Sequence, residues 1–298
     1  MFRFAVMSDI HVQAWDQESQ ARLVSALHDY AFLPEPPDYI VINGDLTEGH
    51  DSDYTVLLHL LETHATCPVY MTMGNHEYYR MWYKQLPTPV WSMATFPNEW
   101  SSEQAMELFL SRLKLSRPYY AERLQGYTFI FLAGECYRDQ VDGIVEHAWI
   151  SDEQFAFLEK QLEQKQNDTP GYNGRPVFVF LHQPIEEVFQ KERLAQLLAA
   201  YPEIIFFSGH THHQLTSRQT YTAPEGRFAI VNSSSVRRPW SDRDEPLDGS
   251  MSESLFVEVQ DDKVIISGRR HDERDWVAQA KFVRSYAKNK KKYRQKIK

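Results

Sequence analysis

The hydrophobic pattern of this chain alternates between short apolar runs and longer segments with helical spacing. Near-continuous apolar residues at 2–7 and 39–43 predict strands that are buried on both faces, because a half-exposed strand would alternate. Residues 17–31 carry apolar side chains three or four positions apart, which predicts a helix, and residues 54–65 repeat this spacing. A third apolar run follows at 69–73. Two strand–helix units and a strand indicate an α/β sheet with right-handed crossovers and helices outside.

The pattern changes between residues 78 and 126. This segment holds three of the seven tryptophans, several prolines and one helical stretch at 103–113. We expect an insertion or cap over one edge of the sheet. Its aromatic side chains are candidates for stacking on a nucleobase, although packing of a small subdomain or a homodimer contact is the commoner use of such residues. The aromatic residues are Trp82, Trp91, Trp100, Tyr78, Tyr79 and Tyr83.

The later half of the chain is richer in predicted strands. Residues 119–123 and 127–133 read as a hairpin that turns at Gln125-Gly126. A helix at 151–166 opens with Ser151-Asp152-Glu153-Gln154, which has the form of a capping box. Another helix is expected at 192–200, and further strands are expected at 177–181, 204–207, 228–231, 255–259 and 264–267. We therefore expect one α/β domain at 1–280 and a basic tail at 281–298.

Length and composition agree with a globular protein. The 298 residues are 42% hydrophobic, which is enough for a large core. No apolar run approaches the roughly 18 residues of a membrane span, and the first apolar stretch is too short for a signal peptide. Cys67 and Cys136 are too few for a disulfide framework and lack CxxC spacing. We expect a soluble cytoplasmic protein without a transmembrane segment.

Charge is distributed unevenly along the chain. The last 18 residues contain nine lysines or arginines and no acid, so the first 280 residues carry −18 of the total net charge of −9. A body this acidic disfavours general binding to a nucleic-acid backbone. The tail is expected to be a frayed, solvated helix. Contact with an anionic surface stays open for it: a membrane, an RNA, or the acidic body of this chain or a neighbour.

Residue types that bind metals follow five of the predicted strands. Open α/β sheets bind ligands outside the carboxyl ends of their strands, so these side chains are expected to gather there. A single histidine after a strand is more often structural, and a lone Gly-Asp pair is commonly a turn, so the prediction depends on the joint pattern. The candidates are Asp9, His11, Asp45, Asn75, His76, His182, His210 and His212.

The chemistry of these candidates indicates two metal ions. Asp9 and His11 are two residues apart, as are His210 and His212, so in an extended segment the side chains of each pair point the same way. Carboxylate, amide and imidazole ligands without thiolate favour Mn, Fe or Zn over Ca or Mg. Two divalent ions would leave net positive charge beside Asp9 and Asp45 and lower the pKa of a bound water towards about 7. An anionic substrate is expected.

These motifs resemble those of the calcineurin-like metallophosphoesterase superfamily. Its signature of D-x-H, G-D, G-N-H-D/E, H and G-H-x-H is matched in order from Asp9 to His212, over about two thirds of the chain. The resemblance implies a four-layer αββα sandwich of mixed sheets with two transition metal ions at its strand ends. It further implies one metal held by Asp9, His11, Asp45 and His212, and another held by Asp45, Asn75, His182 and His210.

The resemblance also implies an activity. A metal-bridging hydroxide would attack phosphorus in line, while Asn75 and His76 contact the phosphate and His76 assists departure of the leaving oxygen. The expected substrate is a phosphodiester, with a cyclic nucleotide as one candidate, or a phosphomonoester. A DNA or RNA nuclease of the same superfamily is an alternative that the acidic body disfavours. A non-catalytic binding module on the same fold is another, which the complete set of ligands disfavours.

The subfamily depends on smaller features. Glu77 after Gly-Asn-His is shared with protein serine/threonine phosphatases, but the arginine that they place before the glycine is absent. The segments at 44–48, 68–76 and 182–184 are similar to those of bacterial class III cyclic nucleotide phosphodiesterases, which usually have a second histidine where this chain has Gln183. His50 and His213 are further candidates for substrate contact, and a loop position without a role is the alternative for each. The Arg237-Arg238 pair has the same two interpretations.

Overall fold

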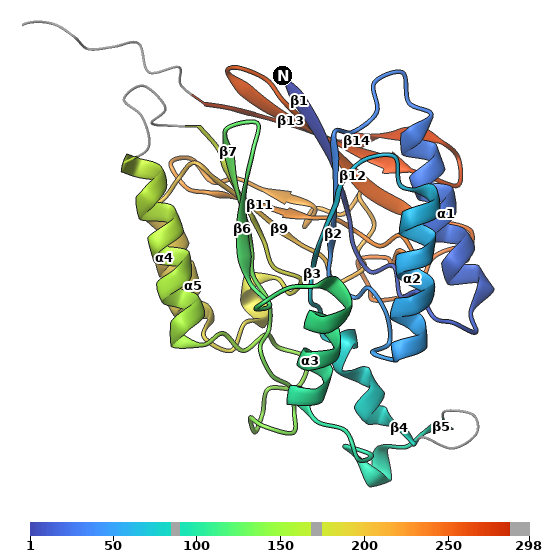
Figure 1. Cartoon of the computed structure of the whole chain (residues 1–298). Coiled ribbons are helices and arrows are strands. Elements are labelled where there is room, and N and C mark those ends of the chain that lie inside the picture. Colours follow the sequence, from blue (N-terminus) through green and yellow to red (C-terminus); the bar gives the residue numbers. More distant parts are fainter. Residues whose placement is uncertain (85–89, 168–174, 287–298) are drawn as a thin grey trace, which may run out of the picture.

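The computed structural model describes residues 1–84, 90–167 and 175–286, with the side chains of 165–167 left aside, and these residues form four layers (Figure 1). Two mixed six-stranded sheets lie face to face. The first sheet contains, in order across it, β14 (Asp275–Ser285), β13 (Lys263–Arg270), β12 (Glu253–Val259), β1 (Phe2–Met7), β2 (Tyr39–Asn43) and β3 (Val69–Thr72). The second contains β10 (Tyr221–Thr222), β11 (Ala229–Asn232), β9 (Ile204–Ser208), β8 (Val177–Phe180), β7 (Tyr127–Phe131) and β6 (Tyr120–Leu124).

Helices cover the outer face of each sheet, as Figure 1 shows. Helices α1 (Gln17–Ala31) and α2 (Asp51–His64) lie against the first sheet, and α4 (Asp152–Asn167) and α5 (Lys191–Ala199) against the second. The αββα sandwich expected from the sequence is confirmed. Among the residues described, none of the helices combines the length and the apolar character that a membrane span requires.

Successive side chains of a strand point to opposite faces of its sheet, and this separates the layer between the sheets from the layers under the helices. Phe4 and Val6 of β1 lie between the two sheets, whereas Ala5 and Met7 face the helices of the first sheet. The layer between the sheets is rich in phenylalanine, and the Phe4 ring centroid lies 5.0 Å from that of Phe178 in the opposite sheet. Full burial of one such side chain stabilises the fold by roughly 1.5–3 kcal/mol. This core holds the ends of the central strands in fixed positions.

The segment after β3 lies beyond one end of the sandwich. It contains η1 (His76–Trp82), β4 (Tyr83–Lys84), β5 (Val90–Trp91), η2 (Met93–Thr95) and α3 (Ser102–Leu113). Its aromatic rings pack largely on one another: Trp82 lies 5.3 Å from Trp91 and 4.4 Å from Phe96. The expected insertion ends earlier than residue 126, because residues 120–124 form β6 at the edge of the second sheet.

The C-terminal end differs from the sequence expectation. Residues 281–285, expected to begin a helical tail, are the end of strand β14, and Phe282 stacks on Tyr221 at 4.5 Å. The register of β14 shifts between Ser267 and Gly268 of β13, so that Val277 and Ala280 are both buried three residues apart. Buried residues three positions apart are typical of a helix rather than of a strand. The rest of the tail, 287–298, lies outside the described residues.

The start of α4 also differs in detail from the expectation. Ser151 Oγ accepts a hydrogen bond from the Gln154 backbone N–H, as a helix cap should. The Gln154 side chain does not complete a capping box, because its amide pairs with the backbone of Ala133 instead. The cap therefore also ties α4 to the end of β7.

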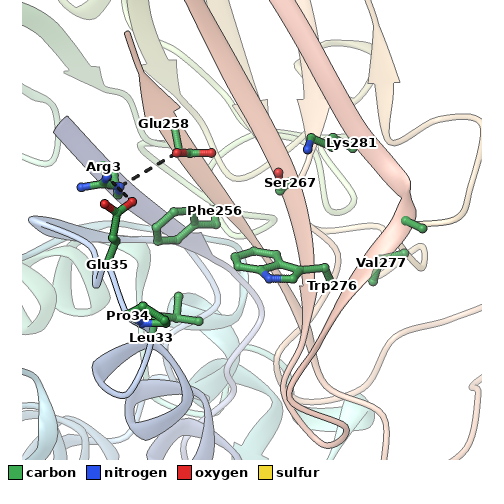
Figure 2. Close-up of a pocket in the computed structure, with 11 residues that line it drawn as sticks. Arg3, Leu33, Pro34, Glu35, Phe256, Glu258, Ser267, Trp276, Val277 and Lys281 are labelled. Atoms are coloured by element: carbon green, nitrogen blue, oxygen red, sulfur yellow. Dashed lines mark hydrogen bonds and ion pairs between the residues drawn. The ribbon is translucent and has the colours of Figure 1, made fainter. Parts of the chain in front are cut away.

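Figure 2 shows a cavity of about 500 Å³ on the outer face of the first sheet. Trp276 and Phe256 lie on the sheet side, and Leu33 and Pro34 of the loop after α1 lie opposite. Arg3, at the start of β1, pairs there with Glu35 and approaches Glu258 at 4.0 Å. The predicted metal ligands follow the carboxyl ends of their strands, so this cavity is separate from them.

Candidate metal centre

The loops after five strands bring the predicted ligands together. β1, β2 and β3 run parallel to one another, as do β8 and β9, so their carboxyl ends lie at one edge of the sandwich. Backbone hydrogen bonds join the loops: the N–H of His11 donates to the carbonyl of Asp45 (3.0 Å), and the N–H of Gly209 donates to the carbonyl of His182 (2.8 Å). The loops therefore form one surface rather than separate projections.

One group of ligand atoms comes from the loops after β1, β2 and β9. Asp9, His11, Asp45 and His212 each offer an atom, and these atoms lie within 4.8 Å of one another. His212 Nε2 is 3.1 Å from Asp9 Oδ1 and 3.2 Å from His11 Nε2. His11 Nε2 is 3.9 Å from Asp45 Oδ2. These four residues are the set expected for one metal.

A second group shares Asp45 with the first. Asp45, His182 and His210 offer atoms within 4.8 Å of one another. His182 Nε2 lies 3.0 Å from Asp45 Oδ2, and Asn75 Oδ1 lies 3.0 Å from His210 Nδ1. The structure thus brings together all four residues expected for the other metal, with Asp45 between the two groups.

The backbone at these residues is unusual. Asp9, His11, Asp45, His210 and His212 have φ values of 52°, 44°, 49°, 69° and 56°. Residues other than glycine disfavour this left-handed region, and the non-glycine residues that adopt it cluster at functional sites. The expectation that Asp-x-His and His-x-His are extended segments is therefore wrong. Left-handed turns, rather than strand alternation, make the paired side chains converge.

Two glycines permit the close approach of these loops. A Cβ atom at Gly74 would lie 2.2 Å from Asp45 Oδ1, and one at Gly209 would lie 1.9 Å from Ser8 Oγ. Both contacts are far shorter than van der Waals distance, so any larger residue would push the loops apart. The Gly-Asn-His and Gly-His-x-His motifs require glycine for this reason.

The electrostatics favour bound cations. Burial alone would raise the pKa of Asp9, but His212 and His182 lower it to about 2. Burial likewise opposes ionisation of Asp45, yet His182 and His76 hold the pKa of its carboxyl well below its usual range. Asp9 Oδ1 and His182 Nε2 are buried and lack a hydrogen bond of good geometry, although each has an ion-pair contact nearby. Two carboxylates, an amide and imidazoles without thiolate fit transition metal ions.

The comparisons with known proteins agree with this geometry. The family model of the calcineurin-like phosphoesterases matches residues 2–214. This chain belongs to the calcineurin-like phosphoesterase family. It is a metal-dependent phosphoesterase, and the enzyme class expected from the sequence motifs is confirmed.

Solved structures of low sequence identity share the fold. A dimetal phosphatase from Danio rerio is 13% identical, with 96% of this chain and 99% of that chain covered and a TM-score of 0.66. A purple acid phosphatase from yellow lupin (Lupinus luteus) seeds is 15% identical, with 95% of this chain and 53% of that chain covered and a TM-score of 0.58. No curated protein matches the chain.

His76 lies at the edge of the phosphoesterase site. Its ring stacks on that of Tyr79 with centroids 3.6 Å apart, and its Nε2 is 3.8 Å from Asp45 Oδ2. Unlike the buried Asp45, His76 is partly exposed. Its ring is therefore accessible from solvent beside the two ligand groups.

Glu48 is a site residue that the sequence reasoning missed. Its Oε1 lies 2.8 Å from His76 Nδ1 and 3.1 Å from His11 Nδ1. Burial opposes its ionisation, but His76 and His11 lower the pKa of Glu48 to about 2. Burial lowers the pKa of His76, and Glu48 and Asp45 reverse this and raise it to about 10. The sequence does contain a signal for Glu48, because this acid lies three residues after Asp45 in the same motif.

Glu146 and Glu187 are two more carboxylates that the sequence did not reveal. Glu146 Oε2 accepts a hydrogen bond from Asn75 Nδ2 (2.9 Å), and Glu187 Oε2 is 2.9 Å from His210 Nε2. Neither lies in a recognisable motif. The charge expected from Asp9 and Asp45 alone was therefore too positive.

Glu77 connects two loops of the site by hydrogen bonds. It is buried, and its carboxylate accepts hydrogen bonds from the backbone N–H groups of Leu46, Thr47 and Gly74 at 2.7–2.9 Å. Burial and the nearby Asp45 raise its pKa to about 7. Glu77 therefore joins the loop after β2 to the loop after β3.

His50 and His213 lie outside both ligand groups. His50 is buried at the start of α2, with its ring 5.4 Å from Trp15 and 5.2 Å from Tyr83. Burial and Arg80 lower its pKa to about 4. His213 Nε2 lies 3.0 Å from Asp244 Oδ1. Substrate contact stays a prediction for both histidines.

Of the basic pair at 237–238, Arg237 pairs with Asp16 and Glu18, each at 3.0 Å. The Arg238 carbonyl lies 2.9 Å from His212 Nδ1. The Arg237 side chain is thus engaged in ion pairs on the surface, while Arg238 contributes its backbone carbonyl to the site.

Proposed function

We propose that the two ligand groups hold two transition metal ions, Mn, Fe or Zn, and that the enzyme hydrolyses a phosphodiester. Asp9, His11, Asp45 and His212 would hold one ion, and Asp45, Asn75, His182 and His210 the other. The observation that carries the proposal is the position of Asp45, which belongs to both groups of ligand atoms. Asp9 Oδ1 and His182 Nε2 support it, because both are buried without a hydrogen bond of good geometry and a cation would satisfy both.

Two such ions, when bound, supply a nucleophile at neutral pH and positive charge for the phosphoryl oxygens. The residues of the chain do the remaining work. Asn75 and His76 would contact the phosphate. Glu48 accepts the Nδ1–H of His76, which leaves Nε2 to donate a proton or a hydrogen bond to the departing oxygen. Tyr79 holds the ring in this orientation by stacking.

A diester fits the charge of the site better than a monoester. Glu48, Glu146 and Glu187 add three carboxylates to the two from Asp9 and Asp45. Against two divalent ions, the protonated His76 and Arg138, which pairs with Glu146, little net positive charge remains for the substrate. A phosphodiester carries one negative charge, whereas a phosphomonoester carries up to two near neutral pH. Repulsion therefore disfavours the monoester more.

A cyclic nucleotide is one diester that suits the surroundings. Trp91 is 48% exposed, and its ring lies 6.3 Å from that of Tyr79, which stacks on His76. These rings offer a surface on which a base could stack beside the reacting phosphate. Tyr78 and Trp82 of the same segment are buried in its packing.

An assay on simple esters tests the proposal. With Mn²⁺, the enzyme should hydrolyse bis-p-nitrophenyl phosphate faster than p-nitrophenyl phosphate, and a cyclic nucleotide should compete with the diester. Asp45→Asn should abolish hydrolysis while the far-UV circular dichroism stays unchanged. Retained activity of this variant would refute the bridging role, and a preference for the monoester would refute the choice of substrate.

A further inference from the structure

Two loops beside the second ligand group are joined to each other. Ala148 and Val188 form a parallel bridge, the N–H of Ala148 donates to the carbonyl of Glu187 (2.9 Å), and the N–H of Phe189 donates to the carbonyl of Ala148 (2.8 Å). Each loop carries one of the carboxylates described above, Glu146 or Glu187. The backbone pairing fixes the two carboxylates relative to each other.

Glu146 sets the orientation of the Asn75 amide. A carboxylate only accepts hydrogen bonds, so the Asn75 group that faces Glu146 Oε2 must be the NH₂ group. The amide oxygen then points the other way, to 3.0 Å from His210 Nδ1. Glu146 is itself held by the Tyr137 hydroxyl (2.8 Å) and by an ion pair with Arg138. The amide therefore has one preferred orientation.

Glu187 sets the tautomer of His210 by the same reasoning. Its carboxylate faces His210 Nε2, so Nε2 must carry the proton. In the neutral ring, Nδ1 then presents a lone pair. Asn75 Oδ1 and His210 Nδ1 are thus two acceptors that face each other across 3.0 Å. Two converging acceptors repel each other unless a cation binds them both.

The other ligand group lacks these two carboxylates. His212 Nδ1 faces the Arg238 carbonyl at 2.9 Å, and His11 Nδ1 faces Glu48. Within the second group itself, His182 Nδ1 faces the Asn43 carbonyl at 2.8 Å. Among the proposed metal ligands, Glu146 and Glu187 therefore pair with Asn75 and His210, two ligands that the first group does not contain.

We propose that Glu146 and Glu187 are positioning residues for one metal position only, the one built on Asn75, His182 and His210. Together they turn the donors of Asn75 and His210 outward and the acceptors inward, and their two negative charges favour a cation there. The affinity of this position is then set separately from that of the position built on Asp9, His11 and His212. The inference rests on the two-metal site proposed above.

Metal titration of the full-length protein tests this inference. Outer hydrogen-bond partners of metal ligands typically contribute 10–100-fold in metal affinity. Glu146→Gln and Glu187→Gln should each weaken one of two Mn²⁺ equivalents by about 10–100-fold and leave the other unchanged. With two equivalents of Mn²⁺ at a concentration that fills both positions of the wild type, electron paramagnetic resonance should show an isolated ion in the variants and a coupled pair in the wild type.

Neighbouring acids in the same loops provide matched controls. Asp142 and Glu186 are exposed and lie four residues before Glu146 and one before Glu187. Asp142→Asn and Glu186→Gln should bind two equivalents as the wild type does. The two test variants act on different ligands, so either one, with an unchanged circular dichroism spectrum, is sufficient for the test.

Two results would overturn the inference: both equivalents weakening in parallel, or both keeping wild-type affinity. These failures are separate from failure of the proposed function. If the wild type binds two ions but hydrolyses no diester, the function is refuted and the titration is still decisive. If the wild type is active and the variants bind both ions normally, the positioning role alone is refuted.

Discussion

Two buried clusters in this enzyme both contain aspartate and histidine, yet they are built in opposite ways. One is the metal-ligand cluster around Asp45. The other lies between α1 and the strands β12 and β13, where His271 Nδ1 is 2.9 Å from Asp29 Oδ2 and His271 Nε2 is 2.8 Å from Ser254 Oγ. The order serine, histidine, aspartate is the order of groups in a serine hydrolase. Ser254 is fully buried, however, and no substrate could reach it.

In the second cluster, which we call the Asp29 cluster, the polar side chains form hydrogen bonds and ion pairs with one another. Arg269 donates to both oxygens of Asp29, at 2.6 and 2.8 Å, and Tyr30 pairs with Ser254 at 2.7 Å. Every charge has a counter-charge, and none of these residues has a positive φ. The metal cluster has left-handed residues instead, and its buried atoms Asp9 Oδ1 and His182 Nε2 have ion-pair contacts but no hydrogen bond of good geometry. A complete hydrogen-bond network is thus typical of a stabilising cluster, and an incomplete one on a left-handed backbone is typical of a ligand site.

Matched substitutions in the two clusters should have opposite effects. Asp29→Asn leaves Arg269 buried with an incomplete partner, and breaking a buried pair in this way costs about 3–5 kcal/mol of unfolding free energy. The activity of the folded fraction should not change. Asp9→Asn should reduce diester hydrolysis by more than the roughly 100-fold that an outer partner of a ligand can cost, because it removes a ligand itself.

Urea unfolding, measured with excess chelator, and hydrolysis, measured with saturating Mn²⁺, separate the two effects. In chelator, Asp9→Asn should lower the urea midpoint less than Asp29→Asn does, because His182 and His212 can lose their protons whereas Arg269 stays charged. The comparison fails if Asp29→Asn lowers the rate per folded molecule, or if Asp9→Asn keeps its activity.

Removal of metal should lower the stability of the native state only by the amount that metal binding contributes. A ligand at 100 times its dissociation constant stabilises the native state by about 2.7 kcal/mol. Chelation should therefore lower the thermal midpoint of the wild type by several degrees, and Mn²⁺ should restore it. Asp29→Asn should show the same shift from a lower starting midpoint, and Asp9→Asn should show a smaller shift. An equal shift in all three proteins would contradict the assignment of Asp9 as a ligand.

Much of the fold was predictable because its signals are local. The bounds of β1, α1 and β2 match the expected 2–7, 17–31 and 39–43, since apolar runs there end abruptly at polar or proline-containing segments. The end of strand β14 was assigned to a helical tail because Phe282 and Tyr286 are four residues apart among lysines and arginines. The two-residue strand β10 is too short to produce a pattern.

The site was predictable for its motif residues and not for their partners. Asp9, Asp45 and His182 follow strands directly, so sequence position places them at the sheet edge. Glu146 and Glu187 reach the site only because Ala148 pairs with Val188, a contact between segments 40 residues apart in the chain. Nothing in the local sequence indicates that pairing. The left-handed backbone at the ligands is likewise set by loop packing and by the close approach at the glycines, which a spacing rule does not contain.

The smallest effect expected in this comparison is a pH dependence carried by the Asp29 cluster. Burial lowers the pKa of His271 below its usual value of 6.5. The unfolded chain then binds more protons than the native state just below pH 6.5, so stability falls as pH falls from there towards the native pKa. Asp29 acts in the same direction at lower pH: burial raises its pKa, but Arg269 and His271 lower it to about 2, so its contribution is lost below about pH 4.

His271→Gln should flatten the profile between pH 7.5 and 5.0, when both proteins are measured in chelator. The slope lost can be at most about 1.4 kcal/mol per pH unit, which corresponds to one proton. The metal-site histidines titrate equally in both proteins, so the difference between the two profiles isolates His271. A variant whose stability falls as steeply as that of the wild type would show that the pH dependence arises elsewhere, and the Asp29 cluster would then differ from the metal cluster only in its pairing.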